Sequence, residues 1–71
     1  MSKLKDTRKK HKLTHQTMAD TLKISKAFYW QLENNKRRLS YDMAIRIAEI
    51  FKMTPDELFY EEYPSLTLFS L

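Results

Sequence analysis

A short segment between Ser25 and Asn35 carries the side chains that could do chemistry. Ser25 suits a helix N-cap, because its hydroxyl can accept from an orphan backbone N–H. Asn35 suits a helix end, because asparagine tolerates the left-handed conformation found there. On the helix between them, Tyr29 and Leu32 share one face, with Phe28 at its edge. The opposite face presents Ala27, Trp30, Gln31 and Asn34. An aromatic and two amides on an exposed face fit a helix that reads nucleic-acid bases, or alternatively an amphipathic helix of a small bundle.

Three cations follow this helix directly, and we predict that they bind phosphate. Lys36, Arg37 and Arg38 lie immediately behind the exposed face in the chain. Cations at that place could position a duplex while the helix reads its bases. The other interpretation is that the run is solvated surface charge.

The charge is divided unevenly along the 71 residues, whose formal net charge is +4. Residues 1–38 contain eleven Lys or Arg and three Asp or Glu, a charge of +8. Residues 39–71 contain two Lys or Arg and six Asp or Glu, a charge of −4. A basic half beside an acidic half indicates a face that meets a polyanion. A basic surface without a partner is the alternative.

Composition excludes several other classes. The chain fits one small domain, and it has no cysteine for a disulfide or a thiolate metal site. Its apolar stretches are far shorter than the ~20 residues of a membrane span, and its charged N-terminus is unlike a signal peptide. We therefore expect a cytoplasmic protein without a membrane partner. His11 and His15 lack a third ligand nearby, and the adjacent Glu61 and Glu62 make a poor acid–base pair. The sequence predicts no enzyme, cofactor, metal or small-molecule ligand.

Short helices on either side would position the central segment. The first is predicted over about Ser2 to Lys10, with Leu4 as its main apolar anchor. The second begins after the N-cap Thr14, and the short connection Lys23-Ile24 joins it to the central helix, as in a helix-turn-helix. Its buried stripe is Met18, Ala19 and Leu22.

Two more helices are predicted in the acidic half. One begins after Ser40, with apolar residues at helical spacing. These are Ala44, Ile47, Ala48 and Phe51. The other has the strongest local signal of the chain, because Thr54 is an N-cap, Pro55 occupies the first helical position and Glu57 completes a capping box. The fold class is therefore all-α.

The C-terminal tail, residues 64–71, is predicted to be extended. Pro64 disfavours a helical conformation at the residue before it, and residues 65–68 alternate between polar and apolar. We hypothesise that the tail pairs with its copy in a second subunit, which would satisfy its backbone groups. The interface leucines would be Leu66, Leu68 and Leu71. The alternatives are a tail that folds back over its own helices or one that is disordered.

The order and spacing of these features resemble the lambda-repressor-like, or Xre/Cro-type, helix-turn-helix domain of phage and bacterial regulators. The match runs from Leu4 to Phe59 and includes Arg8, Leu13-Thr14, Met18-Ala19, Leu22, Ile24-Ser25, Tyr29, Leu32-Glu33-Asn34, Lys36, Ser40, Ile47-Ala48, Phe51 and residues 53–59. The resemblance implies a five-helix DNA-binding domain over residues 1–63. It also implies a transcriptional regulator, a Cro-like repressor that binds a palindromic operator in double-stranded DNA as a homodimer. The alternative is an antitoxin or inhibitor that keeps the fold but acts mainly by binding a protein.

The resemblance also implies roles for individual residues. Base contacts would come from Lys26, Ala27, Phe28 and Gln31. Lysine suits guanine, glutamine suits adenine and alanine suits a thymine methyl. Phosphate contacts would come from Thr14, His15, Gln16, Ser25, Asn34, Lys36, Arg37 and Arg38. A structural ion pair would join Arg8 and Glu33. Lys26 touching only phosphate and Phe28 packing in the core are open alternatives, and the role of Trp30 is undecided.

Three positions depart from the family pattern. His15 stands where glutamine is usual, and Lys23 and Asn35 stand where glycine is usual. Histidine can still donate to phosphate from this position. Lysine in a left-handed turn would cost roughly 1 kcal/mol or more. The turn at Lys23 either keeps that conformation or adjusts to avoid it.

Overall fold

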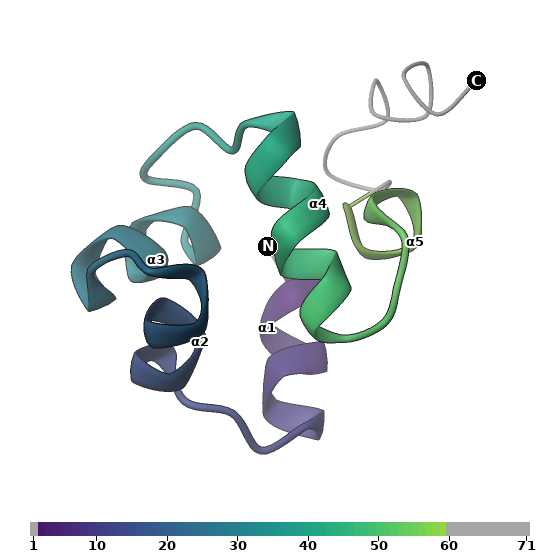
Figure 1. Ribbon diagram of the computed structural model, residues 1–71, viewed down its shortest axis with the longest axis horizontal. Helices are drawn as coiled ribbons and strands as arrows, with labels where there is room; N and C mark the ends of the chain where they lie inside the picture. Colours follow the sequence, from purple (N-terminus) through teal and green to yellow (C-terminus); the bar gives the residue numbers. More distant parts are fainter. Residues whose placement is uncertain (1, 60–71) are drawn as a thin grey trace. The chain divides into compact units, whose positions relative to one another are not determined.

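The computed structural model describes residues 2–59 and contains five helices within them (Figure 1). They are α1 (Ser2–Lys10), α2 (His15–Leu22), α3 (Lys26–Glu33), α4 (Tyr41–Ile50) and α5 (Pro55–Phe59). Residues 2–59 contain no strand, so the all-α prediction is confirmed. The predicted tail with Leu66, Leu68 and Leu71 lies outside the described residues.

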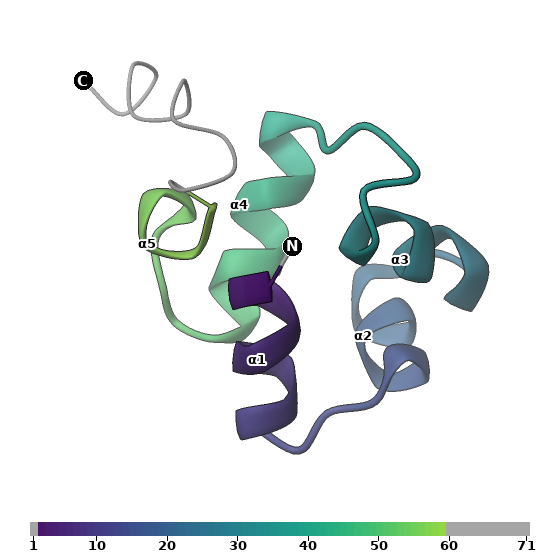
Figure 2. The same ribbon diagram turned by 180° about the vertical axis from the view of Figure 1, so that it is seen from behind.

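Backbone contacts group the chain into two compact units, one ending at Arg38 and the other beginning at Leu39. In the first unit, α2 packs against α3, and both views show this pair side by side (Figures 1 and 2). In the second unit, α4 packs against α5. The division coincides with the change from the basic to the acidic half of the sequence.

The first unit buries the apolar stripes of its three helices. Its buried apolar residues are Leu4, Met18, Ala19, Leu22, Tyr29 and Leu32. Two predicted N-caps start the second and third helices. The Thr14 hydroxyl accepts from the backbone N–H of Thr17 at 3.0 Å, and the Ser25 hydroxyl accepts from that of Phe28 at 3.0 Å. The caps fix where α2 and α3 begin, and so which of their residues face outward.

The second unit is built in the same way. The Ser40 hydroxyl accepts from the N–H of Met43 at 3.1 Å and starts α4. At α5, the N–H of Glu57 donates to the Thr54 hydroxyl at 3.2 Å, and the N–H of Thr54 donates back to the Glu57 carboxylate at 2.9 Å. This reciprocal pair is the predicted capping box. The buried apolar residues of this unit are Leu39, Ala44, Ile47, Ala48, Phe51, Leu58 and Phe59.

Four helices end in the same left-handed turn, and none uses glycine. The left-handed residues are Lys12, Lys23, Asn35 and Lys52, with φ between 55° and 59°. After α2, the N–H of Lys23 donates to the Asp20 carbonyl at 3.2 Å and that of Ile24 donates to the Ala19 carbonyl at 3.0 Å. These bonds satisfy the last carbonyls of the helix in a Schellman motif. Lys23 therefore keeps the left-handed turn, and the alternative of an adjusted turn is wrong.

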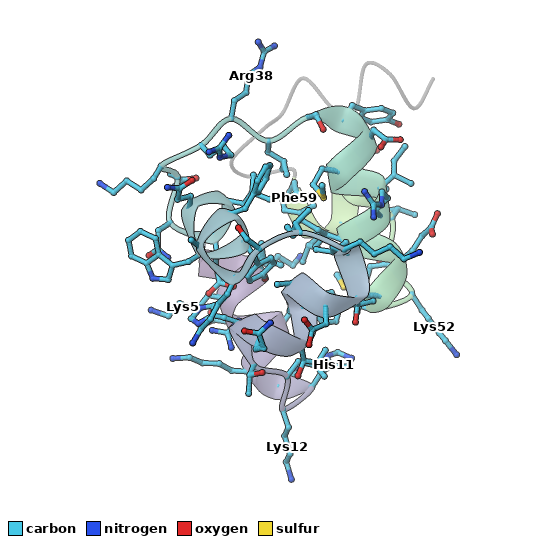
Figure 3. All side chains as sticks on the ribbon, turned by 60° about the vertical axis from the view of Figure 1, so that its left-hand side comes forward. Lys5, His11, Lys12, Arg38, Lys52 and Phe59 are labelled. Atoms are coloured by element: carbon cyan, nitrogen blue, oxygen red, sulfur yellow. The ribbon has the colours of Figure 1, made fainter. Side chains whose placement is uncertain are left out.

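Two of the lysines at these turns, Lys12 and Lys52, point away from the ribbon (Figure 3). The left-handed conformation costs a side-chain-bearing residue about 1–2 kcal/mol. A cation at a helix C-terminus offsets part of this cost by its interaction with the helix dipole. The chain thus ends its helices by hydrogen bonding and charge rather than by the conformational freedom of glycine.

Candidate nucleic-acid interface

The α2–turn–α3 segment has the geometry of a helix-turn-helix. Two eight-residue helices are joined by Lys23, Ile24 and Ser25, and each helix has its own side-chain cap. Tyr29 and Leu32 of α3 are buried, as the periodicity predicted. This places the opposite face of α3 at the surface.

A shallow, mostly apolar hollow lies on the exposed face of α3. Lys26, Ala27, Trp30 and Gln31 line it, and its volume is about 480 Å³. Lys26 and Ala27 are exposed, and Gln31 is half-buried. The indole of Trp30 is 45% exposed, which is large for an aromatic side chain. Cationic, amide and apolar groups therefore meet on one surface of a single helix.

Arg37 folds back onto this helix from the turn that follows it. Its Nε donates to Oε1 of Gln31 at 3.0 Å. Its guanidinium carbon lies 4.4 Å from the centroid of the Phe28 ring. Phe28 is half-buried, so its ring joins the edge of the core and also supports a cation. Sequence reasoning missed this cluster, because it treated Arg37 as one of three equivalent cations.

Arg8 and Glu33 form a buried, bidentate ion pair. The family resemblance predicted this pair. Arg8 Nε donates to Glu33 Oε2 at 2.9 Å, and Arg8 Nη2 donates to Glu33 Oε1 at 3.1 Å. Only 7% of the Arg8 side chain and 2% of the Glu33 side chain are exposed. Arg8 Nη1 also donates to the Leu13 carbonyl at 2.8 Å. The pair ties α1 and the loop after it to the C-terminal end of α3.

The pair determines how its two members ionise. Burial is the largest single influence and would raise the pKa of the Glu33 carboxyl, but the hydrogen bond and charge of Arg8, together with contributions from Tyr29 and His15, outweigh burial and lower that pKa below its usual value. The same hydrogen bond raises the pKa of Arg8. Burial, followed by the nearby Glu33 carboxylate, strongly raises the pKa of the Tyr29 hydroxyl. Arg8 and Glu33 are therefore both charged, and Tyr29 is neutral, at physiological pH.

His15 connects the start of α2 to this buried pair. Its Nε2 lies 3.3 Å from Oε1 of Glu33, and its ring centroid lies 5.9 Å from that of Tyr29. The side chain is 30% exposed, so one edge of the ring faces solvent. His15 thus braces α3 from the position where the family usually has glutamine. His11 lies elsewhere, with Nδ1 at 2.9 Å from the Thr7 carbonyl.

Some of the predicted phosphate-binding side chains already form hydrogen bonds within the protein. The Thr14 and Ser25 hydroxyls cap helices. Gln16 Nε2 donates to Asp20 at 2.8 Å, and Asn34 Nδ2 donates to the Trp30 carbonyl at 2.9 Å. The three predicted phosphate-binding cations behind α3, Lys36, Arg37 and Arg38, are all exposed, and of these Arg37 is engaged by Gln31 and Phe28. Arg38 extends away from the ribbon (Figure 3). Contact of these residues with phosphate stays a prediction.

Comparison with known families agrees with this geometry. Residues 2–64 match the model of a helix-turn-helix domain. The chain belongs to this family. It is the lambda-repressor-like, or Xre/Cro-type, family that the sequence resembles. Membership suggests DNA binding and transcriptional regulation, and helix-turn-helix domains of this kind are typically non-enzymatic. No significant match was found among curated proteins or among solved structures.

A membrane-spanning role finds no support in the described helices. Across residues 2–59, each helix is too short and too polar to span a bilayer.

Proposed function

We propose that this protein is a sequence-specific regulator of transcription, a Cro-like repressor that binds a palindromic operator in double-stranded DNA as a dimer. The observation that carries the proposal is the exposed face of α3, which displays Lys26, Ala27 and Gln31 on a helix-turn-helix frame. The buried Arg8–Glu33 pair holds that helix in place. The charge of +8 in residues 1–38 would draw this unit to a polyanion.

In this proposal, base reading belongs to α3. Lys26 lies in the first turn, which enters the major groove first, and suits guanine. The methyl group of Ala27 suits a thymine methyl. Gln31 offers an amide to a base edge, and Phe28 would contact a thymine methyl or a sugar. Each well-placed contact of this kind contributes on the order of 1–3 kcal/mol of discrimination.

Phosphate contacts would flank the reading helix on both sides. Thr14, His15 and Gln16 lie at the N-terminus of α2, where backbone N–H groups and the helix dipole favour an anion. Ser25 lies at the corresponding end of α3. Asn34 follows α3, and behind it come Lys36, Arg37 and Arg38. These contacts would set the position of α3 along the groove and contribute affinity without selectivity.

Dimerisation would come from the tail hypothesis, with Leu66, Leu68 and Leu71 at the two-fold axis. A two-fold dimer would place two copies of α3 about 34 Å apart, which is one turn of DNA. The operator would then be palindromic, and a bound dimer would exclude polymerase from an overlapping promoter.

The test is selection from a pool of randomised duplexes, followed by titration of the winning sequence and a shuffled duplex of equal length. Trp30 is the only tryptophan and is exposed on α3, so its fluorescence reports binding directly. We expect the selected sequence to bind at least about 10³-fold more tightly than the shuffled one. Affinity should fall steeply between 50 and 200 mM salt. Equal affinity for both duplexes would refute the proposal.

The exposed indole of Trp30 gives the alternative function a specific basis, because tryptophan is enriched at protein interfaces. An antitoxin or inhibitor would use this surface for a protein partner. Such a protein would bind the selected and shuffled duplexes equally. The double variant Lys36→Ala with Arg38→Ala would bind the protein partner as tightly as wild type. A regulator would lose DNA affinity with the same two changes.

A further inference from the structure

Arg37 is held on the reading face of α3 by two different side chains. Its Nε donates to Gln31, and its guanidinium stacks on the Phe28 ring. Phe28 and Gln31 are three residues apart, so they are neighbours on the same side of the helix. Arg37 reaches them because the left-handed residue Asn35 reverses the chain after α3. The contacts fix both the position and the plane of the guanidinium.

A phosphate-binding arginine gains little from such an arrangement. A guanidinium can bind phosphate at two points, but a phosphate group has several oxygens that offer such a contact and does not require one fixed plane. A base edge demands a defined plane, and a guanidinium that is already fixed loses less rotamer freedom on binding. With Nε engaged by Gln31, the two terminal nitrogens of Arg37 keep four N–H donors. Their spacing matches O6 and N7 of guanine in the major groove.

The contact also changes what Gln31 can read. A two-point contact with adenine requires Oε1 to accept from N6 while Nε2 donates to N7. In this structure Oε1 accepts from Arg37, so the orientation of the amide is set by Arg37. Oε1 keeps a second lone pair, so this contact does not exclude a base contact, but it fixes the amide and the guanidinium relative to each other and gives Gln31 a positioning role.

We propose that Arg37 reads a guanine base directly and that Gln31 and Phe28 are its positioning residues. The inference rests on the proposed function, because it assigns one contact within the same interface. It moves Arg37 from the phosphate-binding group to the base-reading group. Arg38 is a matched control, because it is the same residue type one position further on and extends away from the ribbon (Figure 3).

The experiment compares Arg37→Ala, Arg37→Lys and Arg38→Ala in full-length protein by selection from randomised duplexes. We expect a guanine position in the wild-type profile that both Arg37 variants lose, with a drop in preference on the order of 5- to 100-fold. Lysine fails there because it has no Nε–H for Gln31 and no planar group to stack on Phe28. Arg38→Ala should keep the profile and weaken all sequences equally. Circular dichroism checks that each variant is folded.

Gln31→Ala separates positioning from direct reading. A positioning role predicts that the same guanine position persists with reduced preference, whereas direct reading by Gln31 predicts the loss of an adenine position. The inference is overturned if Arg37→Ala weakens all sequences equally, as Arg38→Ala does, or if Gln31→Ala removes an adenine preference. A wild-type protein with no base preference would overturn the proposed function itself, and the inference with it.

Discussion

Replacing Glu33 with alanine would remove the carboxylate that pairs with the buried Arg8 guanidinium, while the hydrogen bond from Arg8 to the Leu13 carbonyl would remain. The side chains of Arg8 and Glu33 are 7% and 2% exposed, so solvent cannot take over the lost contacts. Removing one member of such a pair costs about 3–5 kcal/mol. A domain of this length has a total stability on the order of 4–10 kcal/mol. The variant should therefore lose a third or more of its stability.

Urea unfolding followed by circular dichroism measures this loss, and thermal melting should show a decrease in Tm of roughly 12–40 °C. The matched control is the double variant Arg8→Met with Glu33→Leu, which removes both charges and should recover most of the stability. The reasoning is refuted if Glu33→Ala alone melts within a degree or so of wild type.

The same pair predicts how stability depends on pH. The pKa of Glu33 is lowered in the folded state from its usual value of 4.5, so the folded protein holds this carboxylate ionised more strongly than the unfolded chain does. Its contribution is fully present above pH 4.5 and is lost as pH falls through the lower folded-state pKa. Glu33→Gln should lack this acid-sensitive component in urea titrations below pH 4.5.

Three further predictions concern other elements. Lys23→Gly should raise the free energy of unfolding in urea by about 0.5–1 kcal/mol, because glycine relieves the left-handed strain. The control Lys5→Gly, within α1, should lower it by about 1 kcal/mol. A lower free energy of unfolding for Lys23→Gly would show that the turn is not strained. Thr54→Ala should cost about 1 kcal/mol by removing the capping box, and an unchanged midpoint would mean that α5 does not need it. Truncation after Tyr63 should give a monomer in sedimentation with weaker binding to a palindromic site, and a persisting dimer would place the interface outside the tail.

The helices were largely predictable because their starts depend on local chemistry. Thr14, Ser25, Ser40 and Thr54 each cap the helix that follows within three residues, and no distant contact is needed to identify them. The apolar periods then indicate the buried faces. The turn at Lys23 was not decidable, because the strain of a left-handed lysine and the need to satisfy the last carbonyls oppose each other with similar magnitudes.

The arrangement around Arg37 could not be predicted for a different reason. The spacing of Phe28 and Gln31 places both on one side of a helix, and this was a usable signal. The return of Arg37 to that side depends on the chain reversal at Asn35 and on side-chain stacking, which periodicity does not encode. The buried pair of Arg8 and Glu33 spans 25 positions and was accessible only through the family resemblance.

The left-handed lysines have a consequence for the lifetime of the protein. Lys12, Lys23 and Lys52 each hold about 1–2 kcal/mol of backbone strain, so the last turn of the helix before them opens more often than it would with glycine. Proteases of trypsin specificity cleave after lysine, and they require an opened backbone. At Lys12, Lys23 and Lys52, a strained backbone position and a cleavable bond therefore coincide between successive helices. Limited digestion should therefore cut after Lys12, Lys23 and Lys52, and each cut would separate a helix from the one that follows it.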